Sequence, residues 1–101
     1  MNEFLYMLKP VRLGMVTDAP TDAEGEVLAA HLQYLQELLG SGQAVMFGRT
    51  TNEDISTFGI VVFEADDEAA ALQIMNNDPA VKGGIMTADL FPYRIAGLRG
   101  Q

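Results

Sequence analysis

Apolar residues recur along the chain at two different spacings, and the places where the spacing changes predict the order of the elements. Short runs rich in β-branched and aromatic residues predict strands, and longer amphipathic stretches predict helices. Strands are expected at residues 3–9, 43–49, 57–65 and 85–95, and helices at residues 22–39 and 66–77. The order β-α-β-β-α-β is typical of the ferredoxin-like α+β arrangement, one four-stranded antiparallel sheet with two helices on one face.

The first predicted helix has the clearest periodicity in the chain and carries its only histidine. Its apolar face consists of two neighbouring rows at helical spacing. The first row is Leu28, Leu32, Leu35 and Leu39, and the second is Val27, His31, Tyr34 and Leu38. His31 is therefore expected at the flank of the buried face, where a side chain can line a cavity. Thr21 and Glu24 fit a capping box at the start of this helix.

The remaining segments are predicted as loops and turns. Residues 10–20 form a loop, residues 50–56 a polar turn, and residues 80–84 a short turn with paired glycines. A loop as long as residues 10–20 is uncommon unless it has a task such as covering a site. The first strand looks apolar on both faces and is expected at the centre of the sheet. Pro92 cannot donate to a ladder, so the last strand is expected at an edge or a bulge.

Two helices on one side leave the other face of the sheet uncovered. The strands carry large apolar residues in both registers, namely Phe4, Tyr6, Val45, Phe47, Val61 and Phe63. Because an exposed apolar patch usually marks an interface, we expect two copies to pack sheet against sheet as a homodimer.

Composition narrows the class of partner. The 101 residues are 49% hydrophobic, as in one globular domain spanning residues 1–101. Fourteen acidic and six basic residues give a net charge of −8, which argues against binding to nucleic acid or to an anionic membrane. No apolar run approaches the ~20 residues of a membrane span, and the first residues lack a signal-peptide pattern, so a cytoplasmic location is expected. The chain has no cysteine, and one histidine with scattered carboxylates matches no metal-ligand spacing. Neither a metal nor a cofactor is expected.

His31 and Asp78 are the candidate acid–base pair. Histidine changes charge near neutral pH, and a carboxylate beside it would orient the ring. Asp78 follows the second predicted helix, directly before Pro79, and the two helices are neighbours in this fold. The two side chains are therefore expected to meet at one end of the helix layer. From the residues alone, packing is the commoner role for a lone histidine on a helix flank, and an Asp before a proline more often ends a helix.

Four more residues are candidates for substrate binding. Arg49 follows Gly48 at the end of a strand, where a cation can hold an anionic substrate, with a plain strand-end charge as the alternative. Tyr34 can donate a hydrogen bond to a ligand, and Tyr6 and Phe47 can shape a pocket. For these three aromatic residues, packing in the core or in a dimer is the simpler alternative.

Short segments spread over nearly the whole chain resemble the YCII-related family, whose members are relatives of the small dimeric α/β-barrel proteins. They occur in the family's order and are Phe4-Leu5-Tyr6, His31-Leu32-Gln33-Tyr34-Leu35, residues 39–42, residues 45–48, residues 63–69 and residues 78–84. Arg49 departs from the small residue or proline common at its position, and residues 10–20 do not match strongly.

The resemblance implies a face-to-face homodimer, a cleft in each subunit and a catalytic His–Asp pair at the positions of His31 and Asp78. On this basis we expect a small cofactor-free enzyme in which His31 moves a proton on a small cyclic or aromatic metabolite and Asp78 orients the ring. The reaction would be of a lyase, isomerase or dehydrohalogenase type. The alternatives are a non-catalytic module that binds a small ligand or acts in stress, and a structural dimer with an incidental cleft.

Overall fold

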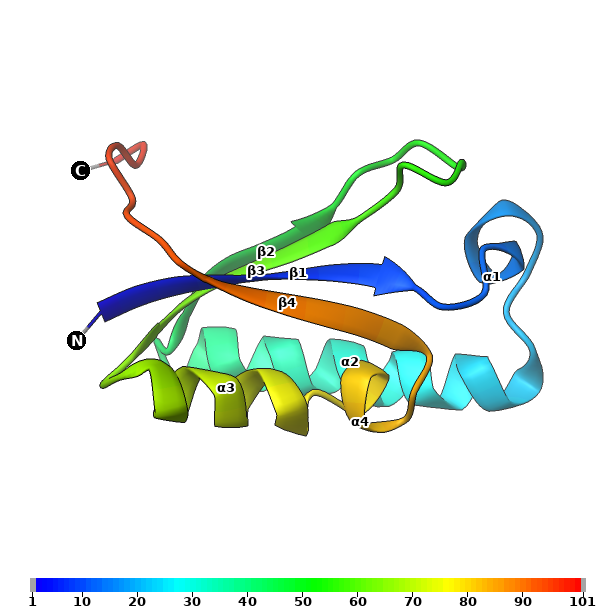
Figure 1. The fold of residues 1–101 in the computed structure, drawn as a ribbon, viewed down its shortest axis with the longest axis horizontal. Helices are drawn as coiled ribbons and strands as arrows, with labels where there is room; N and C mark the ends of the chain where they lie inside the picture. The colour runs from blue at the N-terminus through cyan, green and yellow to red at the C-terminus, as the bar shows by residue number, and fades with distance from the viewer. Residues whose placement is uncertain (1, 101) are drawn as a thin grey trace.

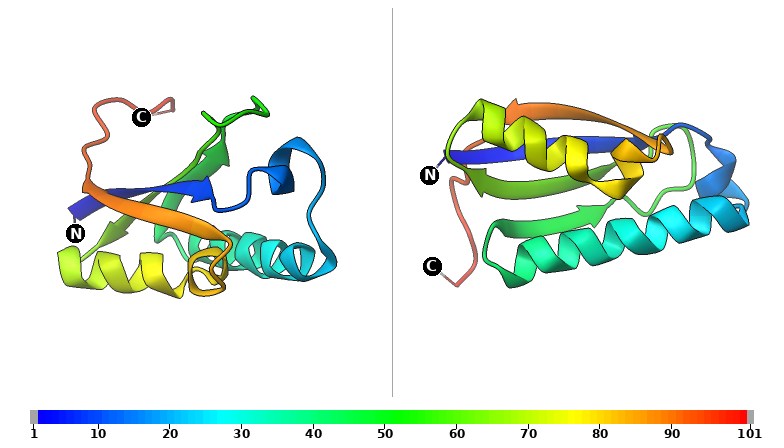
Figure 2. Two further views of the ribbon diagram at one scale, coloured as in Figure 1. Left: turned by 45° about the vertical axis from the view of Figure 1, so that its right-hand side comes forward. Right: turned by 90° about the horizontal axis from the view of Figure 1, so that it is seen from below.

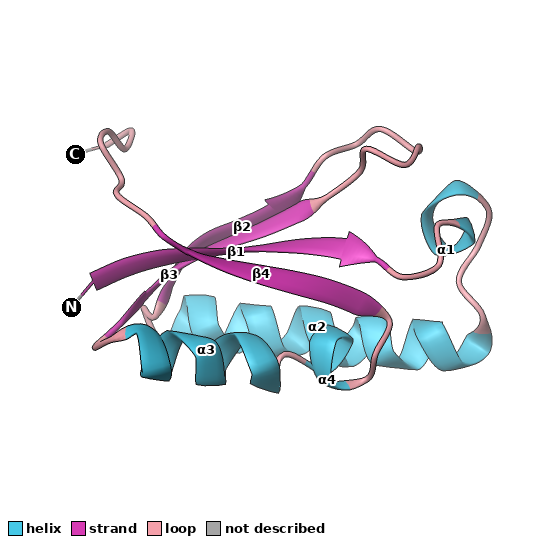
Figure 3. Cartoon of the chain, viewed as in Figure 1, coloured by secondary structure: helices cyan, strands magenta, loops and turns pink. Residues whose placement is uncertain are grey.

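The computed structural model describes residues 2–100, which form one antiparallel sheet and one layer of helices. The elements in chain order are β1 (Asn2–Pro10), α1 (Gly14–Thr17), α2 (Asp22–Gly40), β2 (Ala44–Arg49), β3 (Gly59–Ala65), α3 (Glu68–Asn77), α4 (Pro79–Lys82) and β4 (Met86–Pro92). The sheet lies on one side of the molecule, and α2 and α3 run beneath it (Figures 1 and 3).

The sheet has the strand order β2-β3-β1-β4, and every neighbouring pair is antiparallel. The predicted ferredoxin-like arrangement and the central position of β1 are therefore confirmed. Seen from below, α2 runs along the β2 side of the sheet and α3 along the β1 and β4 side (Figure 2). β4 is an edge strand as expected, and it ends at Pro92, earlier than predicted.

The core fills the space between the sheet and the helices. Its largest side chains come from β1 and β3, and the ring of Tyr6 meets Phe63 edge to face at a centroid distance of 5.5 Å. Leu35 of α2 and Ala71 and Met75 of α3 close the core from the helix side.

The prediction of which residues lie on the open sheet face is wrong in detail. Phe4, Tyr6, Val61 and Phe63 share one register and all face the helices, where they are buried. Side chains alternate along a strand, so the open face takes the intervening positions. They include the apolar residues Leu5, Met7, Met46, Ile60, Val62 and Phe91, and also the charged residues Glu3, Lys9, Glu64 and Asp89. Val62 is buried among them, whereas Met46 and Phe91 are about half exposed, at 45% and 46%.

The buried side of α2 is also rotated from the prediction. Leu35 is buried, but Leu32 and Leu39 of the same predicted stripe are 48% and 44% exposed. The side that packs inward follows the second row instead, because α4 and β2 lie against that side of the helix. Tyr34 and Leu38 accordingly pack against the core.

Two segments predicted as loop or turn contain short helices. α1 interrupts the predicted loop of residues 10–20, and α4 replaces the predicted turn after α3. The guanidinium of Arg12 ties the α1 segment to α2, since it donates two hydrogen bonds to the Glu24 carboxylate, at 2.5 and 3.0 Å, and one to the carbonyl of Ala19. The hydrogen bonds that Glu24 accepts, first from Arg12 and then from the backbone N–H of Thr21, lower its pKa to about 2. Glu24 also completes the predicted capping box with Thr21.

Candidate active site

The candidate pair meets as predicted: His31 Nδ1 lies 2.6 Å from Asp78 Oδ1. The two residues are 47 positions apart in the sequence, so only the tertiary fold brings them together. Because a carboxylate oxygen accepts, the shared proton belongs to Nδ1 of the ring. The other ring nitrogen, Nε2, is then the one able to accept a proton from another molecule. The His31 side chain keeps 13% exposure, whereas that of Asp78 has none.

The chain positions Asp78 through a helix junction. Asp78 ends α3 and is the N-cap of α4, where Pro79 takes the first helical position. Its Oδ1 accepts from the backbone N–H of Ala80 at 2.9 Å, which is the usual N-cap bond. The same oxygen faces His31, so the cap of a short helix also orients the histidine.

A third donor comes from the centre of the sheet. The hydroxyl of Tyr6 donates to Asp78 Oδ2 at 2.8 Å, and both side chains are fully buried. Burial, and then the negative charge of Asp78, raise the pKa of Tyr6 far above its ordinary value of 10. The buried carboxylate thus has donors on both oxygens, from a strand, a helix and a cap, and its orientation is fully determined.

Close packing of α4 on α2 permits this geometry, and Gly83 is the residue that allows it. A Cβ at Gly83 would lie 2.8 Å from the carbonyl oxygen of Pro79 and 3.1 Å from a methyl group of Val27. The first distance is shorter than a real Cβ allows, and the second is tight enough that Val27 would have to shift. The glycine therefore lets the end of α4 approach the helix that carries His31.

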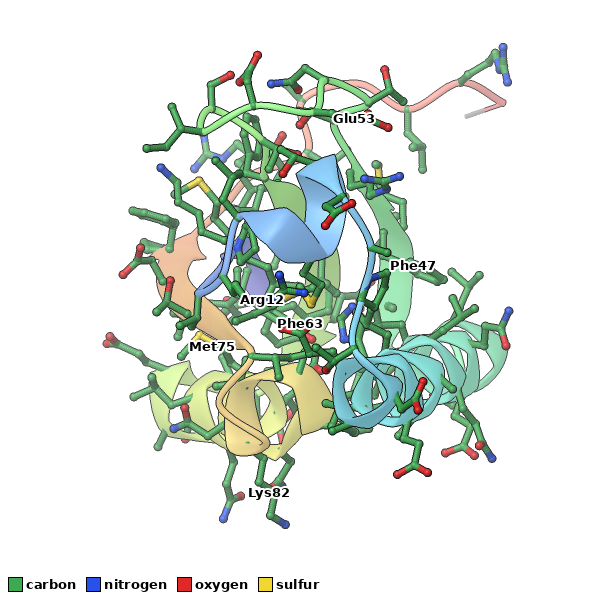
Figure 4. All side chains as sticks on the ribbon, turned by 90° about the vertical axis from the view of Figure 1, so that its right-hand side faces the viewer. Arg12, Phe47, Glu53, Phe63, Met75 and Lys82 are labelled. Atoms are coloured by element: carbon green, nitrogen blue, oxygen red, sulfur yellow. The ribbon has the colours of Figure 1, made fainter. Side chains whose placement is uncertain are left out.

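His31 also lines a cavity of about 380 Å³ at the end of the sheet where β1 and β2 end and β3 and β4 begin. This volume is at the small end of the range for ligand sites. Leu28, Leu32 and Leu35 form the α2 wall beside His31. Figure 4 looks at the molecule from this end and shows α1 in front of the sheet, with Phe47 to one side on β2. Val16 of α1 contributes to the wall, so the segment held by Arg12 closes one side of the cavity.

The structure separates the four residues expected to bind substrate. Arg49 and Phe47 line the cavity. Tyr6 and Tyr34 do not: Tyr6 is sealed in the core, and the hydroxyl of Tyr34 donates to the backbone carbonyl of Ile74 at 2.7 Å. That bond ties α2 to α3. Burial, and to a lesser extent the charge of Asp78, raise the pKa of Tyr34.

Several residues of the cavity were not expected. Gly59 begins β3 and Phe58 directly precedes it, while Val16 comes from α1 and Met86 from β4. Among the lining residues of the described chain, Thr57 carries the only hydroxyl; its side chain is 3% exposed and shares a hydrogen bond with Thr50 at 3.2 Å. The antiparallel pairing of the second and third predicted strands already implied that residues near 58 lie opposite Arg49. That predicted pairing could have identified these residues as part of the cavity wall.

Among residues 2–100, no group of three or more His, Asp or Glu side chains is arranged to hold a metal ion. Within the same part of the chain, no helix has the length and apolar character needed to cross a membrane.

A ferredoxin-like sheet with a His–carboxylate pair beside an apolar cavity defines a class of small α+β proteins. Within this class the chain belongs to the YCII-related family, since residues 10–92 match the YCII-related domain. A solved structure with a similar fold is that of 5-chloro-2-hydroxyhydroquinone dehydrochlorinase (TftG) from Burkholderia phenoliruptrix AC1100 in complex with 2,5-dihydroxybenzoquinone. The two are 20% identical with a TM-score of 0.63, over 90% of this chain and 93% of that one, and they share the fold. A comparison with curated protein sequences finds no match.

Proposed function

We propose that this protein is a small cofactor-free enzyme that moves a proton on a small cyclic or aromatic metabolite. His31 is the acid–base group and Asp78 orients it. The observation that carries the proposal is that one histidine contacts both the cavity and a buried carboxylate. A group placed in this way can exchange a proton with a bound molecule while its own geometry stays fixed.

The chemistry follows from the assignment of the ring protons. With Nδ1–H bonded to Asp78, Nε2 accepts a proton from a C–H or O–H group of the substrate, and the ring becomes a cation. The negative charge of Asp78 stabilises that cation, and Nε2 later returns the proton to the product or to a leaving group. Isomerisation and loss of hydrogen halide both need such a proton acceptor. TftG, which shares the fold, is a dehydrochlorinase solved with a small ring compound, and this supports the class of substrate.

Two further side chains are assigned to substrate contact in this proposal. Phe47 offers a flat apolar surface for a ring, and Arg49 offers a cation. Tyr6 and Tyr34 act behind the wall, through Asp78 and through the α2–α3 contact.

We also propose that two copies pack through the open faces of their sheets. The open face carries the apolar residues named above, and no helix of residues 2–100 covers it (Figure 1). Burying apolar surface of this kind is the usual basis of a stable two-fold dimer.

The test of the enzyme proposal begins with a ligand. A panel of small cyclic and aromatic compounds, quinones and halogenated phenols included, is screened by thermal shift, and compounds that bind are then assayed for turnover. The variant His31→Ala is expected to lose turnover by about 10²–10⁴-fold, because a general base contributes about that much. Its ligand affinity should stay within a few-fold of wild type. Gln36→Ala, on the exposed side of the same helix, is the matched control and should change neither.

Two outcomes would contradict this proposal. If ligands bind but none is turned over, the protein is a binding module, which the largely apolar wall would also suit. If His31→Ala lowers only the stability and leaves turnover unchanged, the His31–Asp78 pair is structural.

A further inference from the structure

The cavity wall is apolar with few exceptions, and one of them is a cation. Besides His31, the only ionisable side chain that lines the cavity in the described part of the chain is Arg49. Among residues 2–100, Arg12 pairs with Glu24 and His31 contacts Asp78, and Arg49 takes part in neither contact. The guanidinium group, with five N–H donors in a plane, is therefore available to a bound anion.

The sheet is built so that this arginine has room at the cavity. Arg49 is the last residue of β2 and pairs with Gly59 of β3. A Cβ at Gly59 would lie 3.7 Å from Cβ of Arg49 and 3.9 Å from Cβ of Leu8, and 3.3 Å from the Gly48 carbonyl oxygen. The glycine leaves free the space that a side chain there would fill, directly beside the base of the arginine. Phe47, two residues earlier on the same side of β2, supplies the neighbouring flat surface.

The net charge of the protein indicates what kind of ligand Arg49 binds. The chain carries a net charge of −8, so its general field repels anions. Arg49, an exposed residue that lines the apolar cavity, is a cation that counters this repulsion locally. A neutral ligand would need no such group.

We propose that the cavity takes a single-ring compound with a carboxylate substituent. The carboxylate pairs with Arg49 on the sheet wall, the ring packs against Phe47, and a hydroxyl or acidic C–H of the ring faces His31 on the helix wall. This inference rests on the proposed function for its reaction, but it concerns recognition and is tested by binding alone. A volume of about 380 Å³ accommodates one ring with its substituents.

The test compares two probes of nearly the same shape, 4-hydroxybenzoate and 4-hydroxybenzamide, by calorimetry or ligand-observed NMR at pH 7. Wild type should bind the carboxylate about tenfold more tightly than the amide, and salt should weaken only the carboxylate complex. Arg49→Gln should remove this preference and leave the amide affinity unchanged, and Arg49→Lys should restore part of it. Arg94→Gln removes the same charge from an exposed residue outside the cavity, and it should leave the preference intact.

Equal binding of the two probes by wild type, no binding of either probe, or equal weakening of both by Arg49→Gln would overturn the inference. The outcome is independent of catalysis, because neither probe has to react. If the carboxylate preference depends on Arg49 while His31→Ala has no turnover to lose, the recognition site stands and the enzyme proposal fails. If turnover depends on His31 but Arg49 does not discriminate between the two probes, the enzyme proposal stands and the recognition site fails.

Discussion

The hydroxyl of Tyr6 is fully buried, and it donates to one oxygen of Asp78. The carboxylate that orients His31 is therefore itself held by a residue at the centre of the sheet. Replacing Tyr6 by Phe keeps the ring that packs on Phe63 and removes this bond alone. It leaves Oδ2 of a buried carboxylate without a donor, so we expect Tyr6→Phe to lower the free energy of unfolding by about 1–3 kcal/mol at pH 7, measured by urea titration.

Tyr6→Phe also changes how the stability of the protein responds to alkaline pH. The unfolded chain releases the Tyr6 proton near pH 10, whereas in the folded protein burial and the charge of Asp78 raise this pKa well above 10. A raised pKa means that the contribution of Tyr6 to stability is fully present below pH 10 and is lost as the pH rises beyond it. Between pH 10 and 11, wild type should lose stability more steeply than Tyr6→Phe. The slope of stability against pH is also measured for Tyr34→Phe, because the pKa of Tyr34 is raised as well. Parallel slopes for wild type and Tyr6→Phe would contradict the assignment.

The contact between His31 and Asp78 was predictable at the level of residues, but the role of Tyr6 was not. The predicted helix order placed the two helices side by side, and that was enough to bring Asp78 to His31. A tyrosine inside an apolar strand is interpreted as an ordinary core residue, because its neighbours in the sequence do not show which polar group its hydroxyl contacts. That partner is 72 positions away and depends on the register of β1 against the helix layer.

At the scale of elements, the strands and the two long helices were predictable because each has its own period. The short helices were not. α1 has four residues, too few for any periodicity, and the residues of α4 fit the prediction of a short turn after α3 equally well. Asp78-Pro79 did contain the signal for α4, since an Asp followed by a proline is also a typical N-cap and first helical residue. The rotation of α2 was beyond prediction, because a periodic pattern shows that a helix has an apolar side but not which neighbour covers each part of it.

The approach of α4 to α2 makes a prediction at this scale. In Gly83→Ala the new methyl group would meet the Pro79 carbonyl and Val27, so the end of α4 has to move. We expect a loss of about 1–3 kcal/mol of stability from such overpacking, together with weaker or lost coupling between Asp78 and His31. Thermal unfolding measures the first effect, and the His31 ring signals in NMR measure the second.

Gly25→Ala is the control for Gly83→Ala. Gly25 lies inside α2, and nothing stands within 4 Å of a Cβ built there. This change should raise stability by up to about 1 kcal/mol, because alanine favours a helix over glycine. The interpretation of Gly83 as a packing residue would be wrong if both variants were stabilised alike.

At the scale of the whole molecule, the two layers leave one sheet face without a cover. The predicted general feature, apolar residues in both registers of the strands, is confirmed, although the residues named for it belong mostly to the covered face. A strand that is apolar at every position does not reveal which register points to the helices. That choice is made by the side of the four-stranded sheet on which α2 and α3 pack.

The open face leads to the prediction on assembly. If two copies pack through it, sedimentation velocity at tens of micromolar should give twice the 11.0 kDa mass of one chain. Phe91→Glu and Met46→Glu each place a charge among the apolar residues of this face, and both residues are exposed enough for the single chain to fold. Each variant should therefore shift the protein to the monomer, because an unpaired charge is costly to bury. Leu72→Glu makes the same kind of change at an exposed apolar residue of α3, on the opposite side of the molecule, and should leave the dimer intact. A wild type that sediments as a single chain, or variants of the open face that behave like Leu72→Glu, would mean that the sheet face is not the interface.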